Sequence, residues 1–364
     1  TLIRVENGQE VERTYGWHKE DWRQLTGLAE LGEALPVMRP GCGSKTLEPG
    51  ISEELELAFG DIRLQSREID MGSAEDPMEA CFERGWSDGL PVVPPTPVRV
   101  LRMLKGTSRK PDEVVGLMPP DLVPVTVEKV AINAVLAGCK PEYMPVLLAA
   151  LEAALTDAFG LHGLICTTMF GSPMIVVNGP AARAIGMNSG VNALGQGNRA
   201  NATIGRALQL IIRNVGGGRP GEIDRATLGN PGKYSFCFAE AEDADWLPLA
   251  QERGIEAGRS AVTLFPGEGV QGIVDQKSRD PESLARSFAL SLRTVDHAKL
   301  AMAGDAVLVV SPEHARVFIE AGWSKQRLRD ELEKLLLAPG AELVAGAGGI
   351  AEGIPERFKD QQVP

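Results

Sequence analysis

Residues 187–215, MNSGVNALGQGNRANATIGRALQLIIRNV, join an asparagine- and glycine-rich loop to a helical pattern. Large apolar side chains recur at the spacing that places them on one face of a helix, at Ile204, Leu208, Ile211, Ile212 and Val215. Arginines follow a seven-residue spacing on another face, at positions 199, 206 and 213. The stretch therefore predicts an amphipathic helix over 199–215 that packs on a core.

The same stretch predicts a binding site. The first turn of a helix has free backbone N–H groups, and glycines let a ligand approach the backbone closely. The side chains expected to bind a carboxylate or phosphate of a small molecule are Asn188, Asn192, Asn198, Arg199, Asn201 and Arg206. In the alternative interpretation the asparagines cap and turn the chain, and the arginines pair with carboxylates of this acidic protein.

The common nucleotide-binding fingerprints are missing from this loop. The run is not a GxGxxG sequence directly after a strand, and the chain contains no GxxxxGK. Dinucleotides and nucleoside triphosphates are therefore disfavoured as ligands. A small carboxylate- or amide-bearing molecule is expected instead.

Short apolar runs predict the strands of the fold, at 161–167, 174–177, 234–239, 261–265 and 306–310. Capping residues and prolines predict helix starts at Thr96, Thr126, Pro141, Asp280–Pro281 and Ser311–Pro312. Strands and helices do not alternate regularly, and two strand candidates follow one another near 161–177. The pattern predicts an α/β fold with a mixed sheet and flanking helices rather than a doubly wound parallel sheet.

The two ends of the chain differ from this body. Asn7–Gly8 lies between two partly alternating runs and predicts an N-terminal hairpin. Residues 35–52 are rich in glycine and proline and predict a loop. We therefore expect an N-terminal hairpin and loop region over 1–75, a main α/β domain over 76–340 and a C-terminal tail over 341–364.

Composition limits the classes of partner. The 364 residues carry a formal net charge of −12, which disfavours binding along a nucleic-acid backbone. No run of eighteen apolar residues is present, and the N-terminal residues lack the pattern of a secretion signal, so neither a membrane nor export is expected. Five cysteines without CxxC spacing suit a reducing compartment. The expected location is the cytoplasm.

A second candidate site lies in residues 230–240, NPGKYSFCFAE. On a strand, Lys233, Ser235 and Cys237 would share a face, and a nearby cation lowers the pKa of a thiol and favours the reactive thiolate. Cys237 is then the candidate nucleophile, Lys233 tunes it, and Glu240 transfers a proton if the strand end bends toward the site. The alternative is a buried cysteine that acts as a small hydrophobe.

Two further thiol arrangements remain candidates. Cys42 lies between glycines and near Lys45, a setting typical of an accessible thiol in redox or covalent chemistry, or of an incidental loop cysteine. His162 and Cys166 would share a strand face and could bind zinc or iron together with another cysteine, although two separated ligands are not a site. The sequence requires no cofactor, and the cofactor stays open.

Several long motifs resemble a family of bacterial proteins grouped with the UGSC (seleno)proteins, which are named for a selenocysteine- or cysteine-Gly-Ser-Cys motif. The motifs lie within 83–325, as ERGWSDGLPVVPPTP (83–97), AINAVLAGCKPEYMPV (131–146), IVVNGPAAR (175–183), NSGVNALGQGNRANATIGRALQLI (188–211), NPGKYSFCFAE (230–240) and SPEHARVFIEAGWSK (311–325). The resemblance implies thiol or selenol redox chemistry. Here Cys42-Gly43-Ser44 is followed by Lys45, so the second thiol of a dithiol cycle is missing.

These patterns predict a cytoplasmic, thiol-assisted enzyme that cleaves or adds at a carbon–heteroatom bond of a small substrate, as a hydrolase or lyase. One alternative is a thiol-dependent oxidoreductase that works through Cys42. Another is a noncatalytic subunit with the asparagine-rich loop as the oligomer contact. In each case a homo-oligomer is expected. The loop can form an active site only if the segment from Lys233 to Glu240 lies against it.

Overall fold

The computed structural model describes residues 2–39, 49–242, 245–295 and 297–363. The chain divides into two compact units. Unit 1 contains Thr1–Gln65 and Thr96–Arg102, and unit 2 contains Ser66–Pro95 and Met103–Pro364. The domain boundaries expected at residues 75 and 340 stay predictions.

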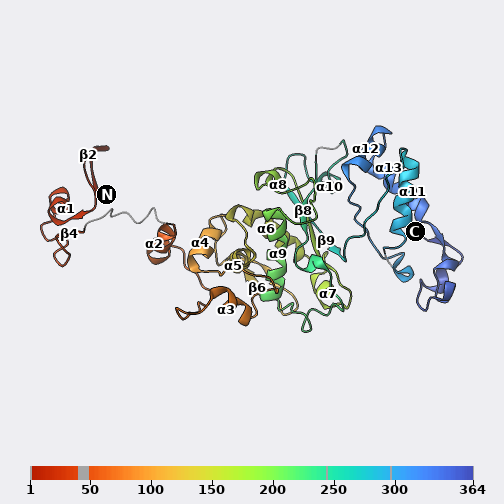
Figure 1. Cartoon of the computed structure of the whole chain (residues 1–364), viewed down its shortest axis with the longest axis horizontal. Helices are drawn as coiled ribbons and strands as arrows, with labels where there is room; N and C mark the ends of the chain where they lie inside the picture. Colours follow the sequence, from red (N-terminus) through yellow and green to blue (C-terminus); the bar gives the residue numbers. More distant parts are fainter. Residues whose placement is uncertain (1, 40–48, 243–244, 296, 364) are drawn as a thin grey trace. The chain divides into compact units, whose positions relative to one another are not determined.

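Unit 1 begins with the predicted hairpin, which is confirmed. Strands β1 (Leu2–Glu6) and β2 (Gln9–Thr14) pair antiparallel. Asn7 and Gly8 connect them with φ values of 51° and 79°, the left-handed backbone that a two-residue hairpin turn requires. Helix α1 (Lys19–Thr26), the short strands β3 (Trp17–His18) and β4 (Met38–Arg39), and helix α2 (Ile51–Phe59) follow (Figure 1).

The main sheet of unit 2 has three strands in the order β8-β7-β9. The central strand β7 (Ser172–Asn178) pairs parallel with β8 (Cys237–Ala239) and antiparallel with β9 (Ala261–Gly267). All seven residues of β7 are buried, because the strand has neighbours on both edges and packing on both faces. The predicted mixed sheet is confirmed.

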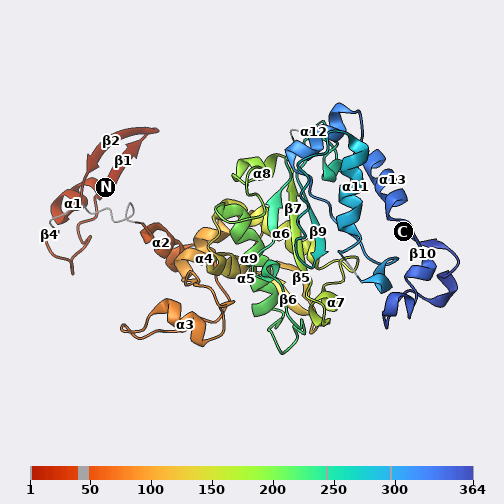
Figure 2. The same ribbon diagram turned by 45° about the vertical axis from the view of Figure 1, so that its right-hand side comes forward.

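Helices cover one face of this sheet. Helix α9 (Arg199–Asn214) packs on β8 and β7, α6 (Met144–Ala154) packs on β9, and α5 (Val127–Ala137) packs on α9 (Figure 2). The predicted helix over 199–215 is confirmed, and its apolar side chains Ile204, Leu208, Ile211 and Ile212 are buried. The opposite face carries Met174, Val176 and Phe238 in a separate apolar cluster.

Several predicted helix starts are confirmed by their capping bonds. The Oγ1 of Thr126, at the end of the hairpin β5 (Val114–Met118) and β6 (Val123–Thr126), accepts a bond from the Lys129 N–H at 3.3 Å. The Oδ1 of Asp280 accepts one from the Ser283 N–H at 2.8 Å and begins α11 (Pro281–Leu292). Shorter helices are α3 (Pro77–Glu83), α4 (Pro97–Leu104), α8 (Pro180–Ala184) and α10 (Leu249–Glu252).

The C-terminal part of unit 2 has an apolar cluster of its own. Helices α11, α12 (Pro312–Glu320) and α13 (Lys325–Leu336) lie together in this part (Figure 2). Their buried cluster contains Phe288, Phe318 and Trp323. Two short strands, β10 (Ala338–Pro339) and β11 (Gln362–Val363), pair near the end of the chain.

Three strand predictions were wrong in whole or part. Residues 161–167 contain helix α7 (Leu161–Cys166), and 306–310 form no strand. The strand expected over 234–239 begins only at Cys237, because Pro231–Lys233 forms a 3₁₀ turn and Tyr234 keeps helical backbone angles. Such short apolar runs do not distinguish a strand from a buried helix segment.

Candidate functional site

Asn201, which is 2% exposed, links the asparagine-rich loop to α9 through hydrogen bonds. Its Oδ1 accepts a hydrogen bond from the Asn188 N–H at 3.0 Å. Its Nδ2 donates to the carbonyl oxygens of Asn188, at 2.9 Å, and Ala193, at 3.1 Å. One side chain on the first turn of the helix thus holds two separate points of the loop.

The other asparagines also bond within the loop. Asn198 is the N-cap of α9: its Oδ1 accepts from the Asn201 N–H at 3.0 Å, and its Nδ2 donates to the Gly186 carbonyl at 2.8 Å. Asn192 has a positive φ of 61° and donates to the Gln196 carbonyl at 2.7 Å. The Oδ1 of Asn188 accepts from the Gly190 N–H at 2.9 Å. These amides shape the loop, as the alternative interpretation expects.

The two arginines of the predicted site also have protein partners. The guanidinium of Arg206 donates two bonds of 2.8 Å to the carboxylate of Asp88 and two more to the carbonyls of Leu90 and Pro91. Burial acts to raise the pKa of Asp88, but the bonds and charge of Arg206 together with backbone N–H bonds outweigh it, so this pKa lies below its ordinary value. Arg199 Nε donates to the Gly138 carbonyl at 2.9 Å. A ligand-binding role for these groups stays a prediction.

Cys237 lies on β8 with its side chain toward α9. A Cβ added to Gly205 would approach the Cβ of Cys237 to 3.1 Å, so the helix covers the thiol closely. Burial raises the pKa of Cys237, and an uncharged thiol is a weak nucleophile. Burial likewise raises the pKa of Cys139, to about 12. Both thiols have the properties of core residues, and a catalytic role for Cys237 stays a prediction.

Lys233 does not lie beside Cys237 on a strand, and that placement was wrong. The 3₁₀ turn at Pro231–Lys233 breaks the expected alternation. The Nζ of Lys233 pairs with the carboxylate of Asp224 at 2.9 Å. The structure does bring residues 235–237 to the first turn of α9, where Ser235 Oγ donates to the Ala202 carbonyl at 2.7 Å.

The remaining candidates are Cys42 and the pair His162 and Cys166. Cys42 and Lys45 lie outside the described residues. His162 and Cys166 lie on helix α7 rather than on a strand. Among the described residues, no three histidine, cysteine or acidic side chains are grouped so that they could hold a metal ion.

A different group of charged residues gathers where β7 and β8 end. The two strands are parallel, so their carboxyl ends lie at the same edge of the sheet. Asn178, the last residue of β7, is 1% exposed. Its Nδ2 donates to Glu240 at 2.7 Å and to Glu242 at 3.0 Å, and both acids follow β8. One buried amide therefore positions two carboxylates.

The carboxylate of Glu240, the predicted proton-transfer group, accepts further hydrogen bonds from the chain. Its Oε1 accepts from Lys325 Nζ at 3.0 Å, and its Oε2 also accepts from the Leu249 N–H at 2.7 Å. With the bond from Asn178, three donors hold this carboxylate. The contacts describe a structural link between β8 and α13, and the proton-transfer role stays a prediction.

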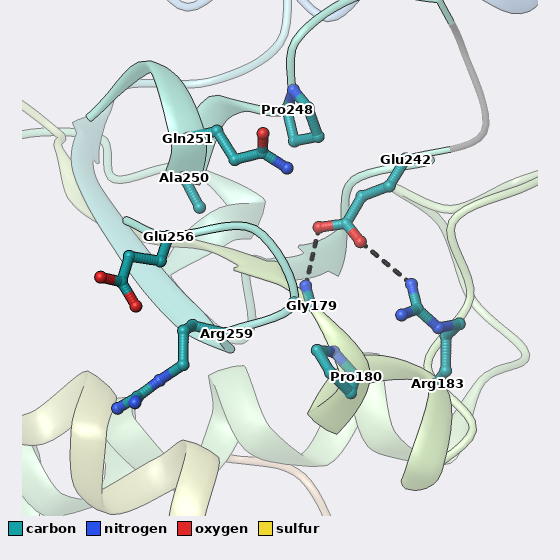
Figure 3. A pocket seen from close by; sticks show the side chains of 10 residues that line it. Gly179, Pro180, Arg183, Glu242, Pro248, Ala250, Gln251, Glu256 and Arg259 are labelled. Carbon is teal, nitrogen blue, oxygen red and sulfur yellow. Dashed lines mark hydrogen bonds and ion pairs between the residues drawn. The ribbon is translucent and has the colours of Figure 1, made fainter. Parts of the chain in front are cut away.

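Glu242 lines a pocket at this edge. It accepts bonds from the Gly179 N–H at 2.7 Å and from Arg183 Nη1 at 3.0 Å, in addition to Asn178 (Figure 3). Burial acts to raise the pKa of Glu242, and these bonds outweigh it, so the pKa is lowered and the group is ionised at neutral pH. The Arg183–Glu242 pair thus forms a fixed, neutral part of the wall.

The pocket is built from three segments that lie far apart in the sequence. Residues 179–183 follow β7, Glu242 follows β8, and residues from Pro248 to Arg259 precede β9. The cavity has a volume of about 50 Å³. Glu256 and Arg259 lie on one side of it, away from the Arg183–Glu242 pair (Figure 3). Within the described ranges, the side chains of Glu256 and Arg259 form no hydrogen bond or ion pair.

The chain matches no protein-family model, no curated protein and no solved structure. The resemblance to the UGSC-associated proteins therefore stays a prediction. No helix within the described ranges combines the length and apolar character needed to cross a membrane. Function is argued below from the residues themselves.

Proposed function

We propose that the chain is an enzyme that cleaves or adds at a carbon–heteroatom bond of a small carboxylate-bearing substrate, held in the pocket at the carboxyl edge of β7 and β8. The observation that carries this proposal is Arg259, an exposed residue at the rim of the pocket whose guanidinium has no partner among the described residues. A guanidinium binds a carboxylate through two parallel N–H bonds, a strong and directional contact.

The position of the pocket supports the same proposal. In open α/β sheets, ligands bind outside the carboxyl ends of the strands, where loops from different strands converge. The pocket lies at the carboxyl ends of the parallel pair β7 and β8. Arg183 and Arg206, by contrast, already bind carboxylates of the chain, which leaves Arg259 free for one from outside.

A carbon–heteroatom reaction also needs a group that exchanges a proton with the substrate. Glu256 is the pocket carboxylate that no described residue occupies. It is therefore available to bond to the heteroatom, whereas Glu242 is held by three donors.

The test is Arg259→Gln, with Arg253→Gln as a matched exposed control outside the pocket. Calorimetric binding of acetate, propionate and succinate should weaken about tenfold or more in Arg259→Gln, since a charge-assisted bond contributes about 1.5–3 kcal/mol. Arg253→Gln should bind like the wild type. Equal binding by all three proteins would contradict the proposed site.

Turnover is tested separately by proton NMR with hydroxy, amino and amide derivatives of short carboxylic acids. A change in one of these substrates that is lost in Arg259→Gln supports the enzyme. Binding without turnover of any member of the panel would leave only a carboxylate-binding protein.

A thiol-assisted reaction would assign the nucleophile to Cys237, which faces α9 and does not line this pocket, so it is a separate proposal with its own test. Iodoacetamide labelling tests it: a nucleophilic thiol reacts in the native protein and is protected by substrate, whereas a core thiol reacts only after unfolding. Full activity in Cys237→Ser would exclude Cys237 as the nucleophile. The described cysteines are free thiols, which supports the proposed cytoplasmic location.

The noncatalytic alternative has one observation of its own. Val191, in the asparagine-rich loop, is 96% exposed, and Leu194 beside it is 43% exposed. We propose that this loop is the contact if the chain forms a homo-oligomer, because exposed apolar side chains favour association. Val191→Asp should then lower the mass measured by light scattering, and an unchanged mass would exclude the loop as the contact.

A further inference from the structure

Two half-buried arginines at the end of α9 have no counter-charge in the part of the chain that the structure describes. Arg213 lies in the last turn of α9, and Arg219 follows shortly after the helix. Neither side chain forms a hydrogen bond or ion pair with a described residue. The chain contains 49 acidic and 37 basic side chains, so the missing partner reflects the local fold rather than a shortage of acids.

Residues 85–91 run along α9 beside Arg213. At the end of the helix, Asn214 Nδ2 donates to the Trp86 carbonyl at 3.0 Å. Two turns earlier, Arg206 donates to the far end of the same segment. Arg213 lies seven residues after Arg206 and shares its face of the helix. Its side chain therefore extends beside the segment.

Arg219 lies at the near end of this segment. A Cβ added to Gly85 would lie 3.8 Å from Cζ, Nη1 and Nη2 of the Arg219 guanidinium. Gly85 directly precedes Trp86, whose carbonyl is bound at the end of α9. Both arginines therefore lie near the same two residues, although they come from a helix and from the chain after it.

Part of this group is already removed from water. The Nε of Arg213 and the Nε2 of Gln209, one turn earlier on the same face, are buried and have no hydrogen-bond partner. Burial of an unpaired polar group costs free energy, and burial of an unpaired charge costs more. An anion that binds the remaining N–H groups of Arg213 neutralises a charge that is already partly desolvated. Burial therefore favours an anion at this place.

The acids of the adjoining segments do not supply the counter-charge. Asp88 accepts two bonds of 2.8 Å from Arg206. Asp224, in the turn after the second arginine, pairs with Lys233 at 2.9 Å. Glu222, in the same turn, is exposed and forms no ion pair within the described ranges. A positive charge therefore remains between residues 85–91 and the end of α9.

We propose that Arg213 and Arg219 bind a phosphate group, either free or carried by a small molecule. Each guanidinium presents a planar fork of N–H groups that matches two phosphate oxygens. The end of α9 carries about −0.5 of an elementary charge, which leaves about +1.5 from the two arginines. A phosphate monoester carries about −1.5 to −2 at neutral pH, so it matches this charge better than a single carboxylate does. The site shares no residue with the pocket at the carboxyl edge and does not depend on the proposed function.

The experiment measures binding of inorganic phosphate and of glycerol phosphate to the full chain by calorimetry at neutral pH. Arg213→Gln and Arg219→Gln should each weaken binding of the tighter probe about tenfold or more. Arg219→Lys keeps the charge but loses the fork, so its affinity should lie between those of the wild type and Arg219→Gln. The exposed controls Arg253→Gln and Arg259→Gln should bind phosphate like the wild type. Urea denaturation checks that each variant folds, and Arg219→Gln, outside the helix, keeps the test valid if Arg213→Gln does not fold.

The two probes also identify the source of the phosphate group. Tighter binding of glycerol phosphate assigns the site to a phosphorylated small molecule, and equal or weaker binding assigns it to the free ion. The inference fails if neither probe binds the wild type, or if Arg219→Gln binds both probes as the wild type does. An equal loss in Arg253→Gln would show general attraction to positive charge and would also overturn it. Binding of acetate by these same variants tests the carboxylate pocket separately.

Discussion

The loop before α9 and the pocket after β7 and β8 use polar side chains in opposite ways. Asn201 in the first region uses both its amide oxygen and its amide nitrogen within the chain. The side chain of Arg259 in the second region has no bond to any described residue. The asparagines of this loop are therefore used in hydrogen bonds that set the shape of the loop itself. A binding site consists of the groups that remain after folding.

The largest expected effect is at the amide that holds the carboxyl edge together. Asn178→Asp replaces a donor to the half-buried Glu240 and Glu242 by a buried acid. We expect a loss of about 4 kcal/mol in the free energy of unfolding, because three like charges would face one another and the donor that now separates them would be lost. Urea denaturation at neutral pH measures it. Adding Glu242→Gln should restore part of the loss, and no recovery would contradict the charge argument.

Asn201→Ala, in the first turn after the asparagine-rich loop, should lower the free energy of unfolding by a smaller amount. The change leaves the Asn188 N–H and two carbonyls without their partner. Unpaired buried groups cost about 1–3 kcal/mol each, and partial hydration of the loop brings the expected loss to about 3 kcal/mol. Gln196→Ala, at an exposed position of the same loop, is the control and should have no measurable effect. Thermal and urea denaturation compare the two variants.

The bond between Asp88 and Arg206 should make stability depend on pH. The native pKa of Asp88 lies below its ordinary value of 3.8, so ionised Asp88 stabilises the fold. This contribution is complete above about pH 5 and is lost as the pH falls through the native pKa. Asp88→Asn should cost about 2 kcal/mol at pH 7. The difference between wild type and variant should shrink below pH 3.8, and a constant difference down to pH 2 would refute the assignment.

The smallest effect on stability is expected in the pocket itself. Arg259→Gln and Glu256→Gln remove side chains that make no bond to the described chain. Each should change the free energy of unfolding by less than about 0.5 kcal/mol while changing ligand binding. Urea denaturation of both variants checks this. A large loss of stability would show that these groups support the fold, and the contrast between the two regions would disappear.

Much of the architecture could be predicted from local patterns. The hairpin at Asn7–Gly8, the caps at Thr126 and Asp280, and the helix over 199–215 depend on residues within a few positions of one another. The helix at 161–166 could not be predicted, because six residues complete less than two helical turns and show no period.

The pocket could not be found in the sequence for a different reason. Arg183, Glu242 and Arg259 come from three loops, and only the pairing of β7 with β8 and β9 brings them together. A search for charged residues just after predicted strands would have found Glu240 and Glu242 but not Arg183, which lies in α8. It could not have shown that Arg206 is paired and Arg259 is free, since that depends on contacts 118 residues apart.

The central position of β7 has a consequence for synthesis of the protein. Ser172 pairs with Gly267, 95 residues further along the chain. While the ribosome makes residues 179–260, the seven residues of β7 lack their partner β9, so one edge of the strand is unpaired. Pairing between such distant segments is slow, and an open strand edge favours aggregation. The nascent chain therefore needs protection of this strand until β9 has emerged, and folding yield should depend on chaperones that bind extended apolar segments.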